Sequence, residues 1–327
     1  MKRRDVLKLL AGTAIAAPRA AMAQSSSQVF SLGTLTAGAP LDEKSPLGGF
    51  LLKALEQRGY VVGKNLTFEA RATAGQVNKL GETIRAMKAD QVDVMVITGF
   101  PTALACKVEN VPTVVALGAG DPVATHLVES LSRPGGNLTG ISDDATALST
   151  KRLALIKQAV PNLQRIAMLW NRDDLGMSMR YEASATAARS IGTTVQPLGV
   201  REPDDFNGVF EAMDRDPPNA ILMVADSLTV LNRKRIYDYA GAHHIPALYE
   251  YDFLVRDGGL MSYGPDLKES FERAAELTAL IFKGARPGDL PFEEPTRYPL
   301  VINLKTAKAT GIDLPPDFIA LADEVIE

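Results

Sequence analysis

The sequence predicts an α/β protein with two doubly wound, Rossmann-like lobes joined by hinge crossovers. Apolar runs of strand length alternate with amphipathic stretches, and this alternation restarts after a Gly-, Asn- and Asp-rich break at 133–144. The length of 327 residues also exceeds what a single core usually supports. The runs Val92–Ile97 and Pro112–Leu117 have no polar face, which is typical of parallel strands covered by helices on both sides.

The first block of elements begins at residue 29. Strands are expected at 29–35, 65–70, 92–97 and 112–117. Apolar residues within 47–55 and 80–87 recur at helical spacing, so each segment is expected to form a helix with one buried face. Asp121 is expected to be the N-cap of a further helix that contains Val123, His126 and Leu127.

The second block repeats this pattern. Strands are expected at 166–170, 194–198, 220–225 and 246–249, with helices at 177–191, around 206–213 and through Tyr237 and Tyr239. A strand at 259–263, a helix at 267–283 and a Pro-rich crossover at 287–299 follow. We therefore expect one lobe to comprise 28–143 plus 261–291, and the other 144–260 plus 292–327.

The first 23 residues have the features of a cleaved signal peptide. They combine a basic start, a short apolar stretch from Val6 to Ala17, and small residues that predict cleavage after Ala23. The apolar stretch is too short to span a hydrocarbon core of about 30 Å. Arg3-Arg4 resembles a twin-arginine export motif, although an ordinary Sec signal peptide fits as well. We expect export to a bacterial periplasm.

Composition excludes several classes of function. The formal net charge is −4 and the isoelectric point is near 5.6, which argues against a nucleic-acid-binding surface. One cysteine and three histidines leave few ligands for a Cys/His metal site. The sequence contains no G-x-S-x-G, H-E-x-x-H or Cys-x-x-Cys motif. No cofactor and no metal ion are expected, and an exported hydrolase is a weak alternative.

Ligands of open α/β sheets bind at the carboxyl ends of the strands, so the residues just after each expected strand are the candidate site. From both lobes we select as ligand-binding candidates Thr36, Ala37, Gly99, Phe100, Pro101, Thr102, Asp121, Asn171, Arg172, Asp226, Ser227, Tyr249 and Tyr251.

Four of these segments have specific chemistry. The helix start at 99–102 has free N–H groups that favour a carboxylate, or it is an ordinary helix start without a ligand. Arg172 is a second candidate for a carboxylate, or a solvated loop residue. Asp226 is placed to accept from an amino group, or to cap the helix after it. Phe100, Tyr249 and Tyr251 are candidates for an apolar wall, whereas Trp170 is expected in the core. A small organic anion or zwitterion is the expected ligand.

The segment VPTVVALGAGDPVATHLVESLSRPGGNLTGIS at 111–142 resembles a signature of solute-binding proteins of ABC importers, in the family that includes tryptophan-binding TrpX-like proteins. Residues 59–65, 101–105 and 301–303 add to the resemblance, which covers nearly all of the chain after the signal peptide. It implies the type I periplasmic-binding-protein fold, a monomer, and delivery of a small solute to ABC permease and ATPase subunits.

The sequence departs from that family in places that bear on the ligand. The loop 36–40 lacks the polar and aromatic residues of the tryptophan-binding branch. In the second lobe, residues 171–178 differ from the sequence that family members often have at this position. The resemblance therefore predicts the fold but does not identify the ligand. A periplasmic sensor that presents its closed form to a membrane kinase remains an alternative to import.

Overall fold

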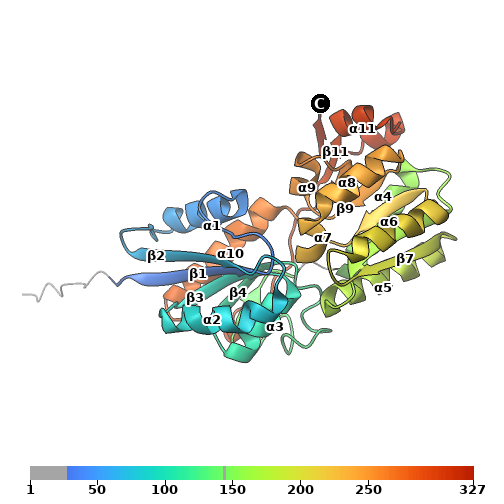
Figure 1. The fold of residues 1–327 in the computed structure, drawn as a ribbon. Helices are drawn as coiled ribbons and strands as arrows, with labels where there is room; N and C mark the ends of the chain where they lie inside the picture. The colour runs from blue at the N-terminus through green and yellow to red at the C-terminus, as the bar shows by residue number, and fades with distance from the viewer. Residues whose placement is uncertain (1–27, 143–144) are drawn as a thin grey trace, which may run out of the picture.

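The computed structural model describes residues 28–142 and 145–327 of the chain, with side chains from 148 onward in the second range. The expected signal peptide at 1–23 lies outside the described residues. Figure 1 shows two lobes side by side, the first at the left and the second at the right. The two-lobed arrangement expected from the sequence is confirmed.

Lobe 1 is built on a five-stranded parallel sheet of order β2-β1-β3-β4-β5. Its strands are β1 (Phe30–Thr36), β2 (Leu66–Ala72), β3 (Val94–Thr98), β4 (Thr113–Leu117) and β5 (Leu138–Gly140). Its helices are α1 (Pro46–Gln57), α2 (Leu80–Ala89), α3 (Phe100–Glu109) and α10 (Leu267–Phe282), with short 3₁₀ turns at Val77–Lys79 and Pro287–Asp289.

Lobe 2 is built on a seven-stranded sheet of order β12-β11-β10-β9-β8-β6-β7, in which only the β10–β11 pairing is antiparallel among the pairings described. The strands are β6 (Arg165–Asn171), β7 (Thr194–Val200), β8 (Ala220–Met223), β9 (Ala247–Tyr249), β10 (Met261–Tyr263), β11 (Leu300–Asn303) and β12 (Glu324–Ile326). The helices are α4 (Ala145–Ala159), α5 (Leu175–Ser190), α6 (Asp205–Arg215), α7 (Ser227–Leu231), α8 (Arg233–Ala242), α9 (Asp252–Arg256), α11 (Leu304–Thr310) and α12 (Pro316–Ile319).

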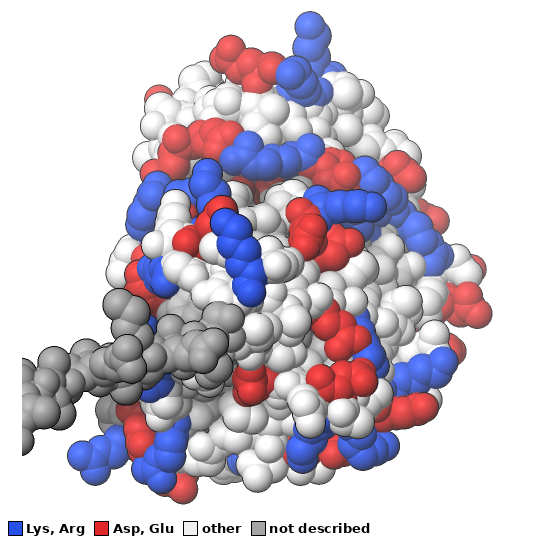
Figure 2. Space-filling model, turned by 90° about the vertical axis from the view of Figure 1, so that its left-hand side faces the viewer, with Lys and Arg blue, Asp and Glu red and all other residues white. Residues whose placement is uncertain are grey.

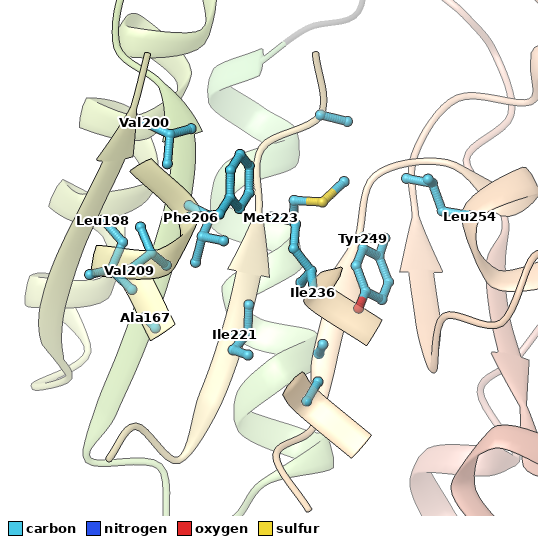
Figure 3. Packing of buried hydrophobic residues seen from close by; sticks show 14 of the residues in the cluster. Ala167, Leu198, Val200, Phe206, Val209, Ile221, Met223, Ile236, Tyr249 and Leu254 are labelled. Carbon is cyan, nitrogen blue, oxygen red and sulfur yellow. The ribbon is translucent and has the colours of Figure 1, made fainter. Parts of the chain in front are cut away.

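Both sheets are covered by helices on both faces, as the apolar strands predict. In lobe 1, α1 and α10 pack on one face and α2 and α3 on the other. In lobe 2, α4 and α5 with the C-terminal helices cover one face, and α6 to α9 cover the other (Figure 3). Each large apolar side chain buried in these layers contributes about 1.5–3 kcal/mol to folding, so each lobe has a core of its own.

The chain passes between the lobes after β5, between β10 and α10, and before β11. In Figure 1 the orange α10 lies among the blue and cyan elements of lobe 1. The residues of β10 were expected in lobe 1 with 261–291, but they pair with β9 and β11 in the sheet of lobe 2. The reason is that Met261–Tyr263 extends the second sheet before the chain crosses to α10.

Two local expectations are wrong. Residues 122–126 form turns and 127–129 bends rather than a helix, and His126 has a left-handed backbone with φ +57°. The Asp121 carboxylate accepts hydrogen bonds from the N–H groups of Val123 and Ala124, so it closes a turn instead of capping a helix. Trp170 is only partly buried and stacks on Tyr181 of α5, at 3.6 Å between ring centroids.

Surface charge on lobe 1 is mixed. Figure 2 views the molecule from the lobe 1 side, and lysines and arginines there alternate with aspartates and glutamates. Lobe 1 also has exposed or half-exposed ion pairs, such as Arg85 with Glu109 and Arg273 with Glu293. Pairs of this kind contribute little to stability, and this face has no broad region of one charge sign.

Candidate functional site

The carboxyl ends of the parallel strands in the two sheets face each other where the lobes meet. A Cβ atom placed on Gly120 of lobe 1 would lie 3.3 Å from the Cα atom of Gly176 in lobe 2. Similarly, a Cβ atom on Gly38 would lie 3.4 Å from the Ser227 hydroxyl. The two candidate loops of lobe 1 thus touch the starts of α5 and α7, so the structure brings residues from the two halves of the predicted site into contact.

On the lobe 1 side, helix α3 begins without a side-chain cap. Its N-cap residue is Gly99, with φ +86°, and it has no side chain to accept from the first N–H groups of the helix. Phe100 and Pro101 open the helix, and the Thr102 side chain is fully buried. The Thr102 hydroxyl has no hydrogen-bond partner among the described residues. Free N–H groups and an unpaired hydroxyl at the positive end of a helix dipole favour an anion.

Sequence reasoning missed a second hydroxyl on this side. Thr73 directly follows β2, is buried, and its hydroxyl also has no hydrogen-bond partner in the part of the chain that the structure describes. Its N–H donates to the carbonyl of Thr36 at 3.1 Å. The expected strand ends at residue 70, two residues early, so the expected site does not include the residues after β2. Extending that strand would have found Thr73.

The loop after β1 is held by its own backbone. The Thr36 hydroxyl donates to the carbonyl of Ala39 at 2.6 Å, and the Ala37 carbonyl accepts from the N–H of Gly75 at the same distance. Both Thr36 and Ala37 are buried. Their role at the site is therefore to hold the loop and Gly38 against lobe 2, while Asp121 is exposed at the far end of its own loop.

On the lobe 2 side, both helices whose starts contact the lobe 1 loops are capped by aspartates. Asp174 caps α5 by accepting from Met177, and Asp226 caps α7 by accepting from Thr229, whose hydroxyl completes a capping box. The Asn171 amide donates to the other oxygen of Asp226 at 2.6 Å. Asp226 was predicted to bind an amino group or to cap the helix after it. It does cap that helix, and the amino-group role stays a prediction.

The two aspartates are close enough to affect each other. Burial raises the pKa of the Asp174 carboxyl from 3.8 to about 7, and the nearby Asp226 carboxylate adds to this rise, against the opposing effect of Arg180. Burial also raises the pKa of Asp226, while hydrogen bonds from Thr229 and Asn171 oppose the rise. A cation bound nearby would stabilise the ionised form of both carboxyl groups, so this edge of lobe 2 favours positive charge.

The remaining candidates occupy two kinds of position. Tyr249 is buried in the lobe 2 core, where Figure 3 shows it beside Ile236 and it contacts Tyr237 edge-on at 5.2 Å between centroids. Tyr251 is also buried and lies in the same apolar cluster as Leu117 of lobe 1. Arg172 is exposed. Tyr249 belongs to that same cluster, so both tyrosines are buried apolar residues, while Arg172 stands at the surface.

A buried ionic cluster under the lobe 2 strand ends was also missed. The Glu250 carboxylate, 1% exposed, accepts from Arg152 of α4 at 2.8 Å and from Arg180 of α5 at 2.6 Å. It also accepts from the N–H of Ala225 at 3.0 Å. Glu250 stood within a candidate segment, but the two arginines lie in the middle of helices, where no sequence spacing pairs them with it.

Two open α/β sheets whose strand ends face each other across a lobe interface can bind a small solute between the lobes. Residues 42–326 match the family described as ABC transporter substrate binding protein. The chain belongs to this family, whose members bind solutes and are generally extracellular or periplasmic. In the described residues no helix has the length and apolar character needed to cross a membrane.

Relatives and solved structures agree with this assignment. A tyrosine-binding protein from Clostridioides difficile strain R20291 is 24% identical over 263 residues, covering 80% of this chain and 75% of that protein. A conserved domain protein from Vibrio cholerae matches 91% of this chain and 100% of its own at 25% identity, with a TM-score of 0.83. An ABC domain from Streptococcus pneumoniae in complex with L-Trp, 23% identical with the same coverage, has a TM-score of 0.81.

Proposed function

We propose that this protein is the exported solute-binding subunit of an ABC importer and that it captures a zwitterionic amino acid between its lobes. The observation that carries the proposal is the contrast in how the facing helices begin. Helix α3 has an uncapped, glycine-led start with the unpaired Thr102 hydroxyl, whereas α5 and α7 are capped by the buried Asp174 and the partly buried Asp226.

This contrast orients a zwitterion. A carboxylate would accept from the N–H groups at the start of α3 and from Thr102, because that helix end has donors without a cap. An ammonium group would donate to Asp226, with Asp174 adding negative charge beside it. The names of two relatives, a tyrosine-binding protein and a complex with L-Trp, support amino acids as the ligand class. Tyr251 and Phe100 are the proposed apolar contacts, and Arg172 a proposed rim contact for the carboxylate.

Lobe closure is the proposed mechanism of capture. A ligand that touches both lobes binds the closed arrangement more tightly than the open one, and this difference shifts the equilibrium toward closure. The close contacts of Gly120 with Gly176 and of Gly38 with Ser227 belong to the closed arrangement. A monomer then delivers its solute to permease and ATPase subunits at the membrane, and cleavage after Ala23 places it in the periplasm.

A thermal-shift screen tests the function. The mature protein, starting at Gln24, would be melted with each of the common amino acids, with their deaminated acids, and with sugars as a negative set. A true ligand at 100 times its Kd should stabilise the protein by about 2.7 kcal/mol, which is readily visible as a rise in melting temperature. X-ray scattering of the same sample should show a smaller radius of gyration. Stabilisation by sugars alone, with no amino acid active, would contradict the proposal.

A further inference from the structure

Glu250 connects the ends of three neighbouring strands of lobe 2. It follows one of these strands directly, and its carboxylate is hydrogen-bonded toward the ends of the other two. In the sheet, β9 lies between β8 and β10, and Glu250 directly follows β9. One carboxylate oxygen accepts from the N–H of Ala225, just past the end of β8. The other accepts from Arg152, whose Nε atom donates to the carbonyl of Tyr263 at the end of β10, at 2.7 Å. The carboxylate therefore sets the spacing of these strand ends.

The same contacts connect the hinge to the ligand-facing residues. Tyr263 is the last residue of β10 before the chain crosses to α10 in lobe 1, and Arg152 belongs to α4, the first helix after the crossing that follows β5. On the other side, Ala225 immediately precedes Asp226. A shift of the crossings would thus reach Asp226 through Arg152, Glu250 and Ala225.

Close packing leaves the side chains of this cluster little room to move. Arg152, Arg180 and Glu250 are each no more than 2% exposed. A Cβ atom on Gly264, the first residue of the crossing, would lie 1.8 Å from the Glu250 carbonyl oxygen, so only glycine fits there. The next residues are tied to the last crossing, because the N–H of Asp266 donates to the carbonyl of Arg297 at 3.0 Å. Arg180 brings α5, which Asp174 caps, into the same cluster.

We propose that Glu250 is a positioning residue that couples the hinge crossings to the ligand-facing end of β8, with Arg152 as the link on the hinge side. Glu250 touches no ligand in this proposal and acts through Ala225 and Asp226. The inference rests on the proposed function for its binding readout, whereas its readout without ligand does not.

The test replaces the link and leaves the ligand-facing residues unchanged. Arg152→Met removes the guanidinium but keeps Glu250 paired with Arg180 and Ala225. Arg152→Lys keeps a positive charge beside Glu250, but a single ammonium cannot reproduce the spread contacts of a guanidinium to Glu250 and Tyr263. Leu314→Ala is the control for destabilisation alone. Leu314 is buried and follows Gly311, where an added Cβ atom would lie 3.3 Å from the His244 ring ahead of β9, whereas Glu250 follows the other end of that strand.

In ligand-free protein, amide hydrogen exchange of Ala225 followed by NMR should be at least about tenfold faster in Arg152→Met than in wild type, and intermediate in Arg152→Lys. The control should leave it within about twofold. With L-tyrosine and L-tryptophan as probes, calorimetry should show five- to tenfold weaker binding in Arg152→Met, about threefold weaker in Arg152→Lys, and unchanged binding in the control.

Unchanged Ala225 exchange in both Arg152 variants would overturn the coupling, and so would equal losses of affinity in those variants and in a control of matched melting temperature. If Arg152→Met does not fold, the Lys variant decides by the same two readouts. If wild-type protein binds neither probe nor any amino acid, the proposed ligand class fails while the exchange measurement still judges the coupling.

Discussion

The two lobes share a doubly wound topology but present chemically opposite edges to the cleft. Lobe 1 presents backbone: Gly99, Gly118 and Gly120 all have positive φ, and α3 starts without a capping side chain. Lobe 2 presents side chains: Asp174 and Asp226 cap the facing helices, with Glu250 and two arginines buried beneath them. A helix start without a cap keeps donors for an anion, and a carboxylate-capped start retains negative charge for a cation. The cleft is therefore polarised across the lobes.

The largest expected effect comes from removing the lobe 2 charge. Asp226→Asn keeps an oxygen able to cap α7 but loses the carboxylate, so amino-acid affinity should fall by ten- to a hundredfold, about 1.4–2.8 kcal/mol. The deaminated form of the same ligand should bind as well as before or better. Calorimetry with both ligands checks this, and undiminished amino-acid binding would remove the ammonium role of Asp226. Asp226→Ala tests the same charge together with the loss of the helix cap.

A change of pH should affect folding stability and amino-acid binding in opposite directions. Because the pKa of Asp174 rises from 3.8 to about 7 on folding, the folded state holds a proton that the unfolded state releases between those values. This group therefore stabilises the ligand-free protein at low pH. Its contribution falls as the pH rises toward 7, by about 1.4 kcal/mol for each pH unit between the two pKa values. Amino-acid binding should go the other way and strengthen as the carboxylates ionise.

Urea unfolding of ligand-free protein at pH 5 and pH 8, beside binding at both values, measures the two trends. Asp174→Asn should flatten the part of the stability profile that depends on this residue. Identical pH slopes in wild type and Asp174→Asn would show that the carboxyl does not titrate in this window.

A larger side chain at the contact between the lobes should lower ligand affinity by a smaller factor than the loss of the Asp226 charge. Gly176→Ala places a Cβ atom 3.3 Å from the Ala119 carbonyl and the Phe100 Cβ, so closure should be hindered and ligand affinity should drop about two- to fivefold. Within lobe 2, the preference of a helix for alanine over glycine, up to about 1 kcal/mol, is opposed by the Asp174 Oδ1 atom, which would also lie 3.3 Å from the new Cβ atom. Gly208→Ala on α6, where a Cβ meets nothing within 4 Å, is the matched control. Equal affinities in the two variants would count against closure at Gly176.

The smallest effect is expected at the rim. Arg172 is exposed, so its attraction for a ligand carboxylate is screened by water and salt. Arg172→Ala should weaken binding by no more than about twofold at physiological ionic strength, and the loss should vanish at a salt concentration of about 0.5 M. A loss of tenfold or more would mean that the arginine folds into the closed cleft and carries the carboxylate contact.

Most of the fold was readable from local pattern. The mainly apolar runs at Val92–Ile97 and Ile166–Trp170 indicate strands that helices cover on both faces. Residues from Val94 onward in the first run, and all of the second run, lie in such strands. The turns and bends at 122–129 were not readable, because Val123 and Leu127 have helical spacing while the Asp121 side chain and the left-handed His126 close the backbone into turns. The placement of β10 depends on pairing with β9 and β11, which are distant in sequence.

By itself, the sequence determined the two-lobed α/β fold, because periodicity is a local property of the chain. It also predicted strand-end segments as the site and offered helix capping as one of two roles for Asp226, since helix starts are local as well. Only the tertiary structure decided which of those residues are buried, which are exposed and which interact with one another. It buried Tyr249 in the core, left Arg172 at the surface, gave Asp174 a carboxylate neighbour, and assembled Arg152, Arg180 and Glu250 from two helices and a strand end. Burial and charge pairing depend on contacts between distant segments, and no spacing along the chain encodes them.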